Sequence, residues 1–105
     1  MEIRIGSHKV TVRKALQTAL RKQLVGKLRR FGAAIAAVQV EVSDRNGRRG
    51  GGDKRCRIRV TLVEGDQIVR DDVAANLWTA CKRAMDRLEN AVRRELRVRP
   101  GLVVS

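Results

Sequence analysis

Hydrophobic and polar residues alternate in four segments of the chain, and this pattern predicts four β-strands. Ile3 and Ile5 alternate with charged residues, and Gly6-Ser7 ends this first short strand. The other three strands are expected at residues 38–43, 55–62 and 67–73. The third has valine, isoleucine and cysteine on one face and arginines on the other, as expected for a strand with one covered face.

Two segments instead carry hydrophobic residues at spacings of three and four, which predicts amphipathic helices. In the first, a leucine stripe runs from Leu16 to Leu28 and continues to Phe31, a helix of about five turns. Thr11 is a candidate N-cap for it, and Gly32 a candidate stop. The second helix has the stripe Leu77, Cys81, Ala84, Leu88 and Val92.

The predicted order is therefore β-α-β-β-β-α. Every strand is apolar on one face only, so two helices with one apolar stripe each can cover that face. We expect an α+β fold in which two helices pack on one face of a four-stranded, mostly antiparallel sheet, similar to a double-stranded-RNA-binding domain. At 105 residues the chain is one domain, with a core at about residues 2–97 and a short tail at 98–105.

Charge narrows the choice of partner. The chain has 24 Lys and Arg against 11 Asp and Glu, a formal net charge of +13. Residues 9–30 contain eight basic and no acidic side chains, whereas ordinary solvated faces mix both signs. This excess favours a polyanionic partner such as RNA.

Candidate RNA-binding residues lie on the polar faces of the two helices and in a glycine-rich loop at 46–52. The helix candidates are Lys14, Arg21, Lys22, Arg29, Arg30, Lys82, Arg83, Arg87, Arg94 and Arg97. The candidates in and beside this loop are Arg45, Arg48, Arg49, Lys54 and Arg55. The alternatives are a solvated helix face and a disordered loop without a partner.

No catalytic or metal site is predicted. Cys56 and Cys81 fall on apolar stripes, so we expect two buried thiols and neither a zinc module nor a disulfide scaffold. His8 is the only histidine and has no nucleophile partner in a recognisable motif. Asp71 and Asp72 are adjacent in a strand and should point to opposite faces, and one of them is expected to cap or precede the last helix.

Three further side chains allow two interpretations each. Trp78 opens the last helix and is either a core or rim anchor or, alternatively, a platform for a stacked base. Arg57 and Arg59 either contact RNA or pair with Glu41 and other acids across the sheet.

Several segments, taken in order, resemble the ribosome hibernation-promoting factor and ribosome-associated inhibitor A family. They are the opening Ile3-Arg4-Ile5-Gly6-Ser7-His8, the helix from Ala15 to Leu28 with its closing Phe31, the strand 38–42, the glycine-rich segment 46–58, and the helix start Asn76-Leu77-Trp78-Thr79-Ala80. The resemblance covers roughly residues 2–97.

This resemblance implies a non-enzymatic, cytoplasmic bacterial factor that needs no cofactor, small-molecule substrate or membrane. Such factors bind the small ribosomal subunit and its rRNA in the mRNA and tRNA channel, and they silence idle ribosomes. We expect the short form of the family, monomeric off the ribosome. The alternative is a general structured-RNA or DNA-binding protein such as a ribosome assembly factor. A small hydrolase or RNase is disfavoured because no acid, base or metal ligands converge.

Overall fold

The computed structural model describes residues 1–44 and 53–97, which form four strands, two α-helices and one 3-10 helix. In chain order the elements are β1 (Glu2–His8), α1 (Lys14–Leu28), η1 (Arg29–Ala34), β2 (Ile35–Asp44), β3 (Lys54–Leu62), β4 (Gln67–Ala74) and α2 (Leu77–Arg97). The order β-α-β-β-β-α predicted from the hydrophobic pattern is confirmed.

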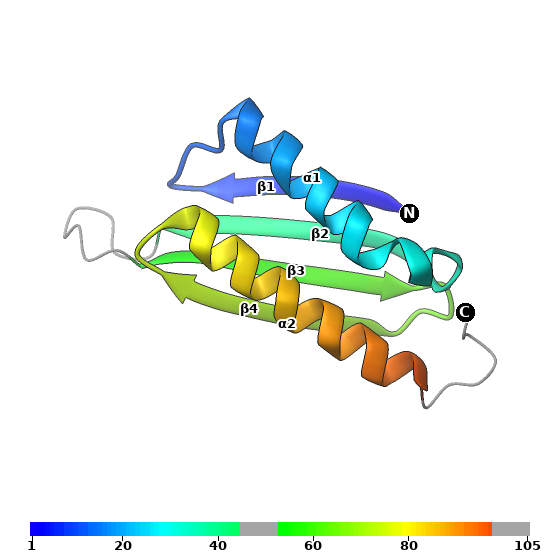
Figure 1. The fold of residues 1–105 in the computed structure, drawn as a ribbon. Helices are drawn as coiled ribbons and strands as arrows, with labels where there is room; N and C mark the ends of the chain where they lie inside the picture. Colours follow the sequence, from blue (N-terminus) through cyan, green and yellow to red (C-terminus); the bar gives the residue numbers. More distant parts are fainter. Residues whose placement is uncertain (45–52, 98–105) are drawn as a thin grey trace.

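The strands form one mixed sheet in the order β1-β2-β3-β4 (Figure 1). β1 pairs with β2 in parallel, with Ile3 opposite Val38. The pairing is parallel because α1 returns the chain to the end of the sheet where β1 begins, so that β2 runs in the same direction. The pairs β2–β3 and β3–β4 are antiparallel, with Val60 opposite both Val38 and Ile68. The sheet is thus mostly antiparallel, as the sequence predicts.

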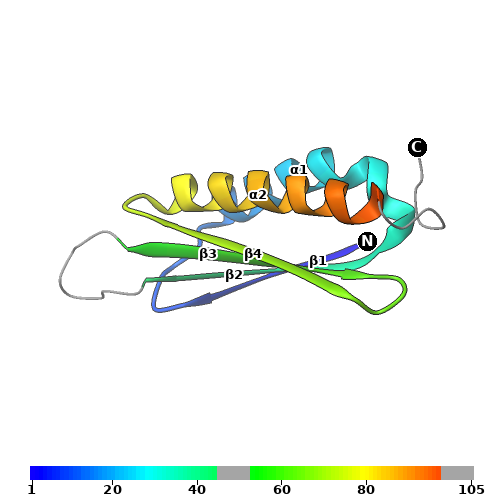
Figure 2. The ribbon, with the colours of Figure 1, turned by 90° about the horizontal axis from the view of Figure 1, so that it is seen from below.

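Both α-helices lie on the same face of the sheet, and the other face is open (Figure 2). α1 runs above the side of the sheet that contains β1 and β2, and α2 runs above β3 and β4 (Figure 1). The fold is therefore a two-layer α+β sandwich, as the pattern of half-apolar strands requires.

The core is the seam between these two layers. α1 contributes Leu20, Leu24 and Leu28, which are at most 1% exposed. The apolar positions of β2 and β3 face them and are almost fully buried. α2 supplies the largest helical share: Ala80, Cys81, Ala84, Met85, Leu88, Ala91, Val92 and Leu96. No polar or charged residue of the described chain is buried in this seam.

The ends of α1 differ from the prediction. Thr11 is not the cap: α1 begins at Lys14, and its N-cap Arg13 makes no side-chain capping hydrogen bond. The chain leaves β1 through Lys9, whose φ of 58° lies in the left-handed region, and Arg13 is still extended immediately before the helix begins. Gly32 is not the stop either, because the α-helix ends at Leu28 and tightens into η1.

The adjacent carboxylates of β4 do point to opposite faces. Asp71 lies on the open face with Arg55, and Asp72 lies on the helix side with Arg87. Of the two alternatives predicted, capping or preceding α2, capping is wrong: both residues lie in β4, which precedes the helix. Asn76 caps α2 instead, because its side-chain oxygen accepts a hydrogen bond of 3.2 Å from the Thr79 backbone N–H.

Ion pairs between strands occupy much of the open face. The Asp71 carboxylate accepts hydrogen bonds from the Arg55 guanidinium at 2.5 and 3.1 Å, and Arg57 lies 3.8 Å from the same oxygen. Arg57 is also the cross-strand neighbour of Glu41. Arg59 lies opposite Gln39 and Val69, so it has no acid directly across the sheet. Of the two interpretations left open for these arginines, pairing therefore describes Arg57 and not Arg59.

The two cysteines are free and buried, as predicted. Cys56 of β3 faces Cys81 of α2, and both thiols are 0% exposed. A hydrogen bond between the thiols, together with burial, raises the pKa of the Cys56 thiol. Cys56 is therefore a neutral core side chain.

Replacing either of two glycines by alanine should change the stability of the fold, in opposite directions. Gly65 turns the chain between β3 and β4 at a φ of +108°, where an L-residue is strained, although its Cβ would meet open space. Gly26 lies exposed inside α1, where a Cβ also meets nothing within 4 Å. We expect Gly65→Ala to destabilise the fold by about 1–2 kcal/mol. We expect Gly26→Ala to stabilise it by up to about 1 kcal/mol.

Urea unfolding of both variants, followed by circular dichroism, measures this difference in sign. A Gly65→Ala variant as stable as the parent would contradict the left-handed turn, and a destabilised Gly26→Ala variant would contradict the exposed position in α1.

The Asp71 carboxylate should make stability depend on pH. Its hydrogen bond from Arg55 lowers the pKa of Asp71 below its ordinary value. A lowered folded-state pKa stabilises the fold above the unfolded-state pKa of about 3.9, and this contribution is lost as the pH falls through the folded-state value. The contribution is small, below about 1 kcal/mol, because the pair is partly exposed.

The unfolding free energy of Asp71→Asn should therefore fall less steeply than that of the parent as the pH drops below about 4. Denaturant titrations at a series of pH values measure both slopes. Parallel slopes for the two proteins would show that the Arg55–Asp71 pair does not carry this effect.

Candidate nucleic-acid interface

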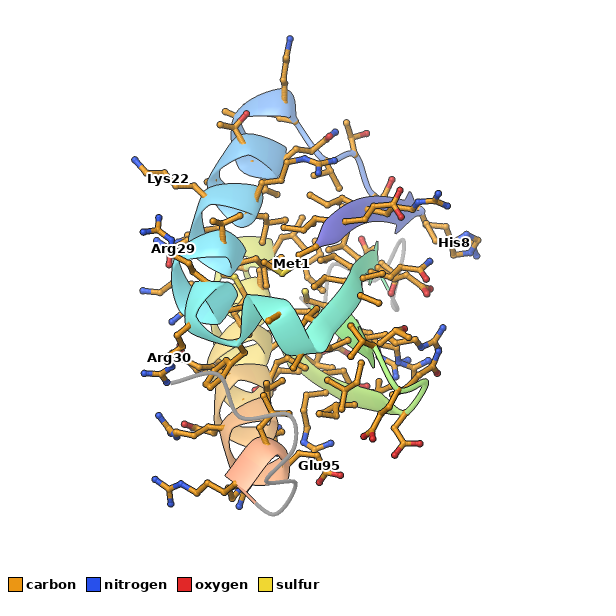
Figure 3. All side chains as sticks on the ribbon, turned by 90° about the vertical axis from the view of Figure 1, so that its right-hand side faces the viewer. Met1, His8, Lys22, Arg29, Arg30 and Glu95 are labelled. Atoms are coloured by element: carbon orange, nitrogen blue, oxygen red, sulfur yellow. The ribbon has the colours of Figure 1, made fainter. Side chains whose placement is uncertain are left out.

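The basic side chains of the helix layer project away from the sheet. Figure 3 shows the helix layer and the sheet side by side. Lys22, Arg29 and Arg30 extend on the helix side, and His8 lies on the sheet side. Lys22, Arg29 and Arg30 are all exposed. The helical spacing that buries the leucines of α1 therefore also places its cations on the opposite, solvent-facing side.

Every charged side chain in the segment that includes α1 and η1 is basic. Residues 13–34 contain seven Lys and Arg and no Asp or Glu. The first turn of α1 holds no acid, and Lys27 lies in its last turn. Nothing within the segment itself neutralises its charge.

α2 has two polar flanks. Lys82, Asp86 and Glu89 follow one another at helical spacing on the flank toward α1. Arg83 and Arg87 lie on the flank toward β4, where Arg87 donates a 3.4 Å hydrogen bond to the Asp71 carbonyl oxygen and lies 3.6 Å from the Asp72 carboxylate.

Two of the acids of α2 are neutralised by cations of α1 and η1. The Lys27 ammonium donates a 2.7 Å hydrogen bond to Asp86 and lies 3.7 Å from Glu89. Arg30 lies 3.6 Å from the other Glu89 oxygen. The hydrogen bond to Asp86 raises the pKa of Lys27, although burial opposes this shift. This inter-helix ion cluster (Lys27, Arg30, Asp86 and Glu89) joins the two helices and removes negative charge from the outer surface.

The predicted helix candidates separate into two groups. Seven are exposed and make no side-chain hydrogen bond or ion pair within residues 1–44 and 53–97: Lys14, Lys22, Arg29, Lys82, Arg83, Arg94 and Arg97. We call these seven the free helix cations.

Three candidates have partners inside the fold. Arg21 donates a 2.7 Å hydrogen bond to the Ile3 carbonyl oxygen, which places it over the edge of β1. Arg30 belongs to the inter-helix ion cluster, and its guanidinium lies 4.7 Å from the centroid of the Phe31 ring. Arg87 is held against β4. Each remains exposed, but each already has a structural role.

Of the loop candidates, Arg45, Arg48 and Arg49 lie outside the described residues, whereas Lys54 pairs with Asp44 and Arg55 pairs with Asp71. Sequence reasoning missed Arg13, which is exposed immediately before α1 and lines a cleft between the two helices. It also missed Lys27 and the Lys27–Asp86 contact. The spacing of the leucine stripe places Lys27 at its edge, but only the arrangement of the two helices reveals its partners.

The open face of the sheet differs in charge from the helix layer. Arg4 lies 3.3 Å from Glu2, and Arg55 and Arg57 share Asp71. Hollows on this face are lined by serine and glutamine as well as by both signs of charge. The excess of unneutralised positive charge is therefore on the helix layer.

Other kinds of site are not found in the described part of the chain. No group of three or more histidine, cysteine, aspartate or glutamate side chains there could hold a metal ion. None of the helices described is long and apolar enough to cross a membrane.

Comparisons with known proteins agree with the fold. The N-terminal domain of Protein Y from Thermus thermophilus superposes with a TM-score of 0.74 at 26% identity, covering 90% of this chain and 98% of that one. A ribosomal subunit interface protein from Coxiella burnetii superposes with a TM-score of 0.77 at 17% identity, covering 90% and 97%. The search of curated protein sequences gives no match.

The family comparison covers nearly the whole chain. Residues 3–99 match the family described as sigma 54 modulation protein / S30EA ribosomal protein. This match includes all the strands and both helices except for Glu2, the first residue of β1, and it agrees with the resemblance seen in the sequence segments. The chain belongs to the sigma 54 modulation protein / S30EA ribosomal protein family, a family of ribosome-associated hibernation and subunit-interface factors.

Proposed function

We propose that the protein binds the small ribosomal subunit through its helix layer, in the channel that mRNA and tRNA would occupy, and thereby silences translation in the cytoplasm. The observation that carries this proposal is the set of free helix cations, which lie on one layer of a protein from a ribosome-associated family. The protein acts without catalysis and as a single copy.

Electrostatics supports an RNA partner. Folded rRNA presents closely spaced phosphates, and a protein that neutralises them gains affinity by releasing counterions. The free helix cations have no competing carboxylate in the described structure, so their charge is available to phosphates. Four of the seven are arginines, which contact phosphate oxygens in a bidentate manner.

Shape supports a structured RNA rather than an extended strand. The helices keep their cations at fixed spacings, because their apolar stripes are packed in the core and their flanks are joined by the inter-helix ion cluster. A rigid array of charges fits a rigid array of phosphates, as in recognition of folded RNA by shape and backbone contacts. Occupying the channel would then inhibit translation by exclusion alone.

Binding to purified small subunits should depend steeply on salt. If six or more phosphates are neutralised, affinity falls about 10³-fold or more between about 50 mM and about 200 mM monovalent salt. Co-sedimentation titrations at constant magnesium measure this dependence, and an in vitro translation assay measures inhibition in parallel. Equal affinity for plain duplex RNA would indicate the alternative, a general structured-RNA binder, and a flat salt dependence would contradict the helix-layer assignment.

Reversing two free helix cations should weaken binding without unfolding the protein. Lys22→Glu with Lys82→Glu changes one cation on each helix, and both side chains are exposed. We expect affinity for the small subunit to fall at least about tenfold and the salt slope to decrease by about 2. Circular dichroism melting should remain unchanged.

The matched control is Arg4→Glu with Arg59→Glu, which changes the net charge equally. Arg4 lies on β1 beside Glu2, and Arg59 lies on the same open face of the sheet, opposite Gln39 and Val69. This variant should bind nearly as well as the parent. Equal losses for the two double variants would mean that overall charge, rather than the helix layer, determines binding.

A further inference from the structure

An apolar cleft opens between the beginnings of the two helices. Leu16 and Ala19 of α1 line one side, and Leu77 and Trp78 of α2 line the other. Arg13 and Asn76 form part of its polar rim. The cleft is open to solvent and has a volume of about 590 Å³, within the usual range for ligand-binding clefts.

Trp78 is only half-buried in this cleft. It packs against the core and still lines the cleft, so it serves as a rim anchor with accessible ring surface. The other aromatic residue, Phe31, stacks with Arg30. Among the described residues, Trp78 is therefore the aromatic side chain available to an external partner.

The charges around the cleft select the kind of partner. No acidic side chain is among the described residues that line it, and Arg13 is. Lys14 begins α1 next to Arg13, and Lys82 lies one turn of α2 after Trp78, on the same side of the helix. A ligand with a flat apolar part and a negative charge beside it satisfies both features.

We infer that this cleft binds one unpaired nucleobase of the RNA partner, stacked against Trp78, while Arg13, Lys14 and Lys82 face the adjoining phosphates. A nucleobase fits because each base has an apolar π-face that stacks on an aromatic ring regardless of sequence. The cleft is continuous with the free helix cations, two of which, Lys14 and Lys82, lie beside it. This inference rests on the proposed function and adds to it a base contact that phosphate binding alone does not supply.

The first test compares variants in their affinity for purified small ribosomal subunits. Trp78→Leu keeps apolar volume in the core but removes the stacking ring, and we expect its affinity to fall about 5- to 150-fold. Trp78→Phe should bind close to the parent. Phe31→Leu is the matched control, since it removes the other aromatic ring away from the cleft, and it should retain affinity.

A folded Trp78→Leu variant that binds subunits as tightly as the parent would overturn the inference while leaving the proposed function intact. Loss of affinity in Trp78→Leu and Phe31→Leu alike would also overturn it, because packing would then be the cause. If the parent itself does not bind subunits, the proposed function fails, and the cleft is judged by the second test alone.

The second test uses the parent protein and does not depend on how a variant folds. Trp78 is the only tryptophan, so intrinsic fluorescence reports on it specifically. Titration with a hexa-adenylate should quench this fluorescence in a saturable manner, whereas an abasic oligonucleotide with the same number of phosphates should not. Equal quenching by both oligonucleotides, or none with either, would show that no base stacks on Trp78.

Discussion

The packing of α2 on β3 and β4 is the interaction on which the rest of the structure depends. α2 buries eight side chains, and half of them are small: Ala80, Cys81, Ala84 and Ala91. Small residues let the helix lie close to the strands, and Cys56 meets Cys81 in that narrow space. Because this face of α2 is buried in the core, Lys82, Arg83 and Arg94 on its other side are exposed to solvent.

α1 is held in a different way, through its leucine stripe and through contacts at its flanks. The inter-helix ion cluster ties its C-terminal end to α2, and Arg21 ties its other flank to the Ile3 carbonyl of β1. These polar contacts are individually weak at a partly exposed surface. Their effect is mainly on orientation, because they fix the rotation of α1 and so determine that Lys22 and Arg29 point away from the sheet (Figure 3).

The spacings of hydrophobic residues along the sequence were sufficient to predict the element order, the two layers and the opposite faces of Asp71 and Asp72. They could not predict the ends of α1, because its start depends on how the chain leaves β1 through Lys9. They also treated Arg21 and Lys22 alike, although only the folded chain brings the Ile3 carbonyl to Arg21. Local spacing determines which face a residue occupies, whereas its partner comes from a distant segment.

The distinction between paired and free arginines gives the molecule its two different faces. On the open face, Glu2 of the same strand pairs with Arg4, and Asp71 of the neighbouring strand pairs with Arg55 and Arg57, so much of that positive charge is neutralised within the sheet. In the helix layer Asp86 and Glu89 of α2 pair with Lys27 and Arg30, and the outer cations keep their charge. A polyanion approaching from solvent therefore meets an asymmetric field, and this field orients the protein with its helices toward RNA before any specific contact forms.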